Sequence, residues 1–141
     1  MTNIDMDRQD GMPFDEINGS TVVKLMEYCR DDRVPESVEE AVDILFRILG
    51  CEFGRKVIHM HPLAFSAKYH FTLGLYIRNC FGLWRRDSKI MRELNAFMAD
   101  EASGIIMDML WYRFRRECYQ PSDHEKIQLK KTIYIHEEYI D

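Results

Sequence analysis

The chain has 141 residues, of which 46% are hydrophobic, 12% aromatic and 30% charged, and its formal net charge is −5. A chain of this size can bury a core without metals or disulfides. Its hydrophobic and aromatic content excludes wholesale disorder, and its charged fraction favours a soluble protein. The first ten residues, MTNIDMDRQD, have neither a basic start nor an apolar run. We therefore expect no signal peptide and a cytoplasmic location.

Charge is distributed unevenly along the chain. Residues 1–50 hold 12 acidic and 5 basic side chains, a net charge of −7, whereas residues 51–120 hold 7 acidic and 11 basic side chains, a net charge of +4. An acidic front and a basic middle are typical of internal pairing or of a polar protein partner. They do not fit a nucleic-acid-binding protein, which normally has a dominating basic face.

The four cysteines lie far apart in the sequence, without a C-x-x-C pair or a nearby histidine at metal-ligand spacing. In a chain without a signal peptide we expect reduced and mostly buried thiols. His59 and His61 offer two imidazoles on a strand-like segment, but no third ligand accompanies them. We predict no metal site and no cofactor.

The N-terminal part of the chain predicts an arm followed by a short helix. Residues 1–19 contain glycine and proline among acidic residues and lack periodicity, which predicts a flexible acidic arm. From Ser20, STVVKLMEYC predicts a helix because its apolar residues recur at helical spacing. These residues are Val22, Leu25, Met26 and Cys29.

The clearest helix signal follows. Ser37 and Glu40 form a capping box, in which the serine hydroxyl meets the N3 amide and the glutamate reaches back to the cap. An apolar stripe then runs to Gly50, where a left-handed residue would end the helix. The sequence predicts a helix over 38–49.

Three more helices are predicted further along. Pro62 can open a helix over 63–81 that Gly82 stops, and its scarcity of polar residues predicts a place at the centre of a bundle. SKIMRELNAFM, which either Asp87 or Ser88 can cap, predicts the next helix, with Ile90, Met91, Leu94 and Phe97 turned inward. A last helix begins near residue 100, with acidic residues at its start and arginines at its end.

The expected architecture is therefore all-α, a compact bundle of four to five helices. We divide the chain into a flexible arm over 1–19, a helical domain over 20–118 and a short C-terminal extension over 119–141. The extension contains TIYIH, which has β character but no visible strand partner.

Two motifs stand out: HFTLGLYIRNCFGLW, at residues 70–84, and ADEASGIIMDMLW, which begins at residue 99. Their glycine, arginine, asparagine and tryptophan stand at fixed offsets that resemble the pattern of an uncharacterised family of small bacterial proteins. The resemblance covers roughly residues 36–114 and implies a helical, cytoplasmic domain of unknown function. The family pattern usually has His-Pro before the acidic pair, where this chain has Met98-Ala99.

The polar residues of the first motif have a functional and a structural interpretation. His70, Gly74 and Arg78 follow each other at intervals of four, so one stripe of a helix would carry them. They would form an anion or substrate site, with Arg78 as clamp and His70 as acid or base. Alternatively, Gly74 admits a crossing helix, with Gly104 opposite, while Arg78 pairs with Asp100 or, as second choice, Asp108. We favour the structural interpretation.

Other candidate residues are weaker. Asn79 is expected to bond to backbone near the FGLW turn, and Trp84 and Trp111 to anchor the core. A Ser103–His70–Asp100 triad is conceivable, but no nucleophile elbow or oxyanion loop accompanies it. No catalytic residue is predicted.

Three functions remain open. The first is a non-catalytic bacterial protein-interaction module, such as an immunity, inhibitor or adaptor protein, that binds another protein through an acidic surface. Its expected surface residues are Asp31, Asp32, Glu36 and Glu39. The second is an enzyme or small-ligand-binding protein that uses His70 and Arg78. The third is a nucleic-acid-associated regulator that uses the basic residues at 85, 86, 89 and 92.

Overall fold

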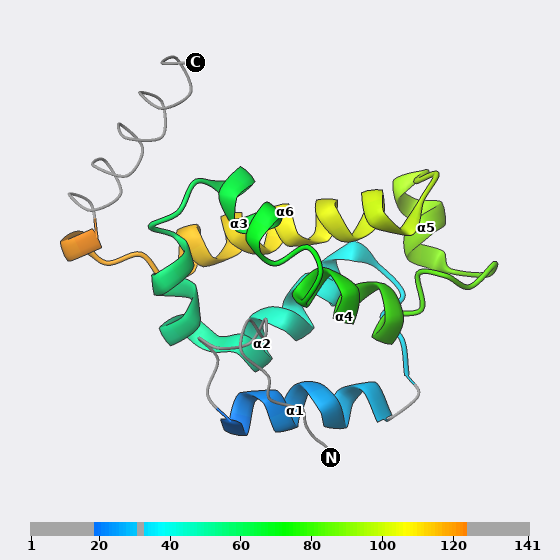
Figure 1. The fold of residues 1–141 in the computed structure, drawn as a ribbon, viewed down its shortest axis with the longest axis horizontal. Coiled ribbons are helices and arrows are strands. Elements are labelled where there is room, and N and C mark those ends of the chain that lie inside the picture. The colour runs from blue at the N-terminus through cyan, green and yellow to red at the C-terminus, as the bar shows by residue number, and fades with distance from the viewer. Residues whose placement is uncertain (1–18, 31–32, 124–141) are drawn as a thin grey trace.

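A computed structural model of the chain describes residues 19–30 and 33–123 (Figure 1). Six α-helices and one short 3₁₀-helix make up these residues, which contain no strand. The helices are α1 (Gly19–Arg30), α2 (Val38–Val57), α3 (Pro62–Lys68), α4 (Leu73–Cys80), α5 (Lys89–Leu94) and α6 (Ala99–Glu117), followed by η1 (Pro121–Asp123). The all-α prediction is confirmed for this part of the chain, although it contains six α-helices rather than the expected four to five. The predicted arm, apart from its last residue, and the TIYIH segment lie outside the described residues.

The predicted capping of α2 is present, and the helix is longer than expected. The Ser37 hydroxyl accepts a hydrogen bond from the Glu40 amide at 3.0 Å, while Glu40 accepts from the amide of Glu36 rather than from Ser37 itself. Gly50 has the predicted positive φ, 79°. It kinks the helix rather than ending it, and helical backbone resumes as far as Val57. The strand-like interpretation of residues 59–61 is wrong, since they form a turn in which His61 caps α3.

The long helix expected over 63–81 is two helices. The carbonyl of Tyr69 accepts hydrogen bonds from the amides of Thr72 and Gly74 and from the Thr72 hydroxyl. These bonds close a turn over 69–72, because a threonine hydroxyl offers the backbone an alternative to helical bonding. Gly82 does end α4 as predicted, with φ at 69° and a bond from the Leu83 amide to the Arg78 carbonyl.

The central helix is α6, not the 63–81 segment. In Figure 1, α6 runs across the molecule, and it contacts α2, α3, α4 and α5. One long face of α6 is completely buried, whereas α4 exposes Leu75. The fully buried residues of that face are Ala102, Ser103, Ile106, Met107, Leu110 and Phe114.

The contact between α2 and α6 depends on a glycine that the sequence analysis did not single out. A Cβ atom on Gly54 would lie 2.5 Å from Cδ1 of Phe114, so no side chain fits at this position without displacement. Phe114 also packs against Phe53, with ring centroids 5.9 Å apart. Beside it, the buried indole of Trp111 donates a hydrogen bond to the Val57 carbonyl at 3.0 Å. Trp111 is a core anchor, as predicted.

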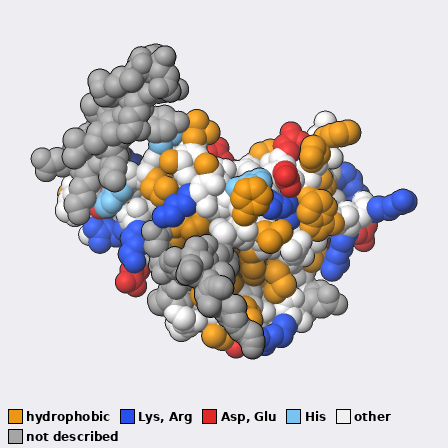
Figure 2. Space-filling view, in the orientation of Figure 1, with side chains coloured by type: hydrophobic (Ala, Val, Ile, Leu, Met, Phe, Trp, Pro, Cys, Tyr) orange, Lys and Arg blue, Asp and Glu red, His pale blue; other side chains and the backbone are white. Residues whose placement is uncertain are grey.

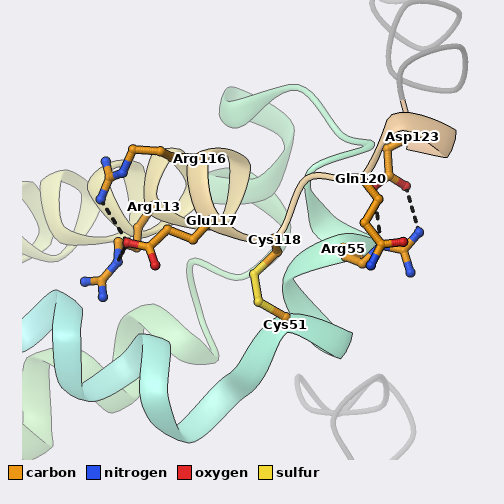
Figure 3. Close-up of a disulfide and its surroundings, with 8 residues drawn as sticks. All are labelled: Cys51, Arg55, Arg113, Arg116, Glu117, Cys118, Gln120 and Asp123. Carbon is orange, nitrogen blue, oxygen red and sulfur yellow. Dashed lines mark hydrogen bonds and ion pairs between the residues drawn. A yellow bond between two sulfur atoms is a disulfide. The ribbon is translucent and has the colours of Figure 1, made fainter.

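The expectation of reduced, mostly buried thiols is wrong. Cys29 is bonded to Cys80, and Cys51 to Cys118 (Figure 3), so no cysteine is free. Of the four, only Cys118 is buried, and Cys29 and Cys51 lie on exposed positions. Pairing could not be predicted from spacing, because partners 51 and 67 residues apart meet only through the fold.

Candidate functional site

The polar residues of the first motif meet around the buried side chain of Arg78. Its Nη1 atom donates to the Ser103 hydroxyl at 2.9 Å, and Nη2 donates to the backbone carbonyl of His70 at 3.3 Å. Its Nε atom lies 3.4 Å from Oδ1 of Asp100, the predicted first-choice partner. The guanidinium group is thus bound on three sides by groups from the 69–72 turn and from α6.

Exposure differs sharply within this cluster. The Arg78 side chain is 5% exposed, whereas those of His70 and Asp100 are 31% and 50% exposed. The His70 Nε2 atom lies 3.9 Å from Oδ2 of Asp100, which is too far for a hydrogen bond. Arg78 is therefore the buried charge of this cluster, and it is also the residue with three polar partners.

This geometry fits a structural role, in which Arg78 joins α4 to the 69–72 turn and to α6, better than a catalytic site. The Ser103 side chain is completely buried, and its hydroxyl donates to the Asp100 backbone carbonyl while accepting from Arg78. A serine nucleophile would need a base at its hydroxyl and access for a substrate. The observed bonds direct that hydroxyl elsewhere, so they do not form the Ser103–His70–Asp100 triad.

The expected helix, α6, does approach Gly74 through Met107, but the nearest atom belongs to Arg78 of the same helix as Gly74. A Cβ atom here would lie 3.0 Å from Nη1 of Arg78 and 3.5 Å from Cε of Met107. Gly104 has open space around its own Cβ position, so it takes no part in this contact. The absent side chain of Gly74 leaves room for the Arg78 guanidinium.

Asn79 and Trp84 lie at the surface. The Trp84 indole donates to the side-chain carbonyl of Asn79 at 2.9 Å, and Trp84 is 62% exposed. The prediction that Trp84 anchors the core is therefore wrong, and Asn79 bonds a side chain rather than the backbone. The short turn over 81–84 directs this indole outward while Phe81 and Leu83 are buried.

Trp84 belongs to a group of large apolar side chains that the fold leaves in water. Phe71 lies in the 69–72 turn and Leu75 in the first turn of α4, and Asn79, which binds Trp84, is one helical turn beyond Leu75. Phe97 and Met98 precede Asp100, which lies beside His70, the neighbour of Phe71. The exposed fractions of the five are 77% for Phe71, 45% for Leu75, 62% for Trp84, 92% for Phe97 and 55% for Met98.

We call these five residues the apolar face. Figure 2 shows hydrophobic side chains gathered over α4 and towards the junction of α5 and α6. Aromatic side chains present roughly 150–250 Å² each, so this face amounts to several hundred Å². Phe97 was expected to point inward, but α5 ends at Leu94 because Asn95 adopts the left-handed conformation, with φ at 51°. Sequence periodicity therefore did not reveal the apolar face.

The acidic surface expected to bind a partner is only partly described. Asp31 and Asp32 lie outside the described residues. Glu36 and Glu39 are exposed, and Glu36 forms an ion pair with Lys89 at 3.3 Å. The basic residues considered for nucleic acid are likewise engaged in part, since Arg92 donates to the carbonyl of Asp87.

A second polar cluster, which the sequence analysis missed, surrounds the buried Asp123 at the C-terminal end of the described chain (Figure 3). Asp123 is 1% exposed and accepts bonds from Nε and Nη2 of Arg55 at 3.3 and 3.2 Å. The Nε2 atom of His59 lies 3.0 Å away and the Gln120 amide 2.9 Å away. Burial alone would raise the pKa of Asp123, but the bonds from Arg55, His59 and Gln120 hold it well below its usual range.

Neither cluster forms a metal centre. Among the residues that the structure describes, no group of three or more histidine, cysteine or acidic side chains could hold a metal ion. The two histidines considered as ligands have other roles, because His59 binds Asp123 and the Nδ1 atom of His61 accepts from the Leu63 amide.

A cleft of about 730 Å³ lies between α1 and α2. Its lining mixes apolar side chains with both signs of charge. The lining residues include Tyr28, Arg33, Glu40, Ile44, Arg47 and Ile48. Arg47 is paired with Asp43 and Glu40 with the Glu36 amide, so the lining offers no concentrated charge of either sign.

The described residues form an all-α domain with a buried arginine bound by polar groups and an exposed apolar face. A family described as "Domain of unknown function (DUF6794)" matches residues 34–114. The match spans more than half of the chain, so the protein belongs to this family. Comparison with curated proteins and with solved structures found no match. Within the described part of the chain, no helix is both long and apolar enough to cross a membrane.

Proposed function

We propose that this domain is a non-catalytic bacterial protein-interaction module, of the immunity, inhibitor or adaptor type, that binds another protein through its apolar face. The observation that carries the proposal is the exposure of Phe71, Leu75, Trp84, Phe97 and Met98 on neighbouring elements. Contiguous exposed apolar surface of several hundred Å² is typical of interaction sites. Phenylalanine, tryptophan and methionine are also enriched in the centres of protein interfaces.

The charges beside this face indicate what its partner should carry. Asp100 and Glu101 follow Phe97 and Met98 after one intervening residue, Ala99, in the first turn of α6, and both are exposed. Arg78 is too deeply buried to present its charge to a partner. A partner with an apolar ridge flanked by lysine or arginine would therefore complement both the face and its acidic border.

The test compares the apolar face with the acidic surface as rival binding sites. The parent protein is used as bait in extracts of its native host, and the captured partner is then purified and titrated calorimetrically. The face variant carries Phe71→Ser and Phe97→Ser. The surface variant carries charge reversals at Asp31, Asp32, Glu36 and Glu39. We expect the face variant to lose at least tenfold in affinity and the surface variant to change mainly the association rate.

A matched control shows whether any loss of affinity is specific to the apolar face or follows from removing exposed apolar side chains anywhere. Met109 and Tyr112 are 45% and 54% exposed on α6, outside the apolar face, and Met109→Gln with Tyr112→Gln should retain affinity. Thermal melts should show all variants folded. Full affinity in the face variant, or loss only in the surface variant, would refute binding through the apolar face. Sedimentation of the protein alone shows whether a second copy covers this face instead.

A further inference from the structure

All four cysteines of the chain are used in two disulfides. The Cα atoms of Cys29 and Cys80 are 5.0 Å apart, and those of Cys51 and Cys118 are 5.3 Å apart. Both values fall within the range that disulfides require, about 4.4–6.8 Å. Four cysteines allow three pairings. The fold brings together the two cysteine pairs of one of these pairings, although the partners are 51 and 67 residues apart in sequence.

Each disulfide joins the family domain to a segment outside it. Cys51 and Cys80 lie within the family match over 34–114, whereas Cys29 is on α1 and Cys118 follows α6. The two bridges therefore attach the N-terminal and C-terminal additions, one each, to the domain that the family shares.

Polar contacts lie near both bridges. At α1, however, few apolar side chains are buried. Only Thr21 and Leu25 of α1 are buried, and the Tyr76 hydroxyl donates to the Leu25 carbonyl at 2.6 Å. At the other end, Asp123 is held by Arg55 and His59 of the α2 region. Val22 and Tyr28 are only partly buried against the core, so the hydrophobic attachment of α1 is limited and the covalent link adds to it.

From these observations we infer that the protein works in an oxidising compartment, outside the reducing cytoplasm, with both disulfides formed. Bridges that hold additions to a small domain are typical of exported proteins, whereas cytosolic thiols are kept reduced. Each bridge forms when two thiols pass two electrons and two protons to a thiol–disulfide oxidoreductase, whose own disulfide becomes a dithiol. If the proposed function holds, the partner is a protein of that same compartment.

The cysteine state is tested in intact cells of the native host. Cells are quenched with acid, and free thiols are alkylated under denaturing conditions with a polyethylene-glycol maleimide that adds mass for each thiol. We expect no mass shift before reduction and four additions after it. Two or four additions before reduction would overturn the inference. This measurement does not involve the apolar face, so its failure and failure of the proposed function are distinguishable.

The structural role of the bridges is tested on the purified oxidised protein. Addition of dithiothreitol should lower the Tm by roughly 10 °C or more. The variant with Cys29→Ala and Cys80→Ala, and the variant with Cys51→Ala and Cys118→Ala, should each show part of this loss without reductant. An unchanged Tm on complete reduction would contradict the role of the bridges as restraints. Should either variant fail to fold, the reduced parent still provides the comparison.

Discussion

The Nε atom of Arg78 lies 3.4 Å from Oδ1 of Asp100, yet the arginine is almost completely buried and the aspartate is half exposed. Removal of the arginine should therefore lower the free energy of unfolding more than removal of the aspartate. Asp100→Asn leaves Arg78 bound to Ser103 and to the His70 carbonyl, and we expect it to cost less than about 1 kcal/mol. Arg78→Ala leaves a cavity and removes the donor to the Ser103 hydroxyl and to the His70 carbonyl, and should cost about 2–4 kcal/mol.

Denaturant unfolding of these variants, with Arg78→Met and the Arg78→Met/Asp100→Asn pair, gives the coupling energy. We expect a coupling below about 1 kcal/mol, because water can solvate Asp100 when the arginine is absent. A parent-like stability of Arg78→Ala combined with lost partner binding would show that Arg78 serves binding and not the fold.

Gly54 and Gly104 provide a matched pair of glycine substitutions. Both lie within helices, but a Cβ atom on Gly54 would meet the Phe114 ring at 2.5 Å, whereas one on Gly104 meets nothing within 4 Å. We expect Gly54→Ala to destabilise the protein by about 1–3 kcal/mol through overpacking. Gly104→Ala should instead stabilise it by about 0.4–1 kcal/mol. Thermal melts suffice, and equal effects of the two substitutions would contradict the α2–α6 contact described above.

The two tryptophans should respond differently to replacement by phenylalanine. Trp111→Phe removes the buried donor to the Val57 carbonyl, which should cost about 1–3 kcal/mol. Trp84→Phe breaks an exposed bond to Asn79 and should change the free energy of unfolding by no more than about 0.5 kcal/mol. Chemical denaturation, monitored by circular dichroism, measures the free energy of unfolding of both variants. A large loss at Trp84 would mean that this residue supports the fold rather than the apolar face.

Asp123 predicts a specific loss of stability in acid. Its pKa is held below the unfolded value of about 3.9, so its stabilising contribution is complete above that value and is lost as the pH falls towards the folded pKa. We expect the stability of the parent to fall between roughly pH 5 and pH 2. Asp123→Asn should be less stable than the parent at pH 7 but lose less over this interval. Asp108→Asn, which changes an exposed carboxylate on α6, is the control.

Local signals predicted the ends of elements better than their arrangement. The Ser37 cap and the stop at Gly82 follow from short-range chemistry, and both are present. The break at residues 69–72 was missed because an apolar run at helical spacing does not reveal that Thr72 will bind the Tyr69 carbonyl. That break makes α4 short and gives the central position to α6.

The exposed residues were the hardest to predict. Phe97 and Trp84 have the character of core residues, and only the left-handed Asn95 and the turn after Phe81 place them in water. The Asp123 cluster joins groups more than 60 residues apart, so no local pattern indicates it. The same is true of both disulfides. Hydrophobic periodicity identifies which segments bury side chains, but turn geometry decides which side chains are left outside.

The two chain segments that the disulfides close overlap in sequence. Cys29–Cys80 closes one covalent loop and Cys51–Cys118 another, and the loops share residues 51–80. A single cut of the backbone anywhere between residues 29 and 118 therefore leaves both pieces joined by at least one bridge. A molecule nicked once by a protease would migrate as a full-length chain without reductant and as two fragments with it. The protein can thus survive one broken peptide bond in this region without coming apart.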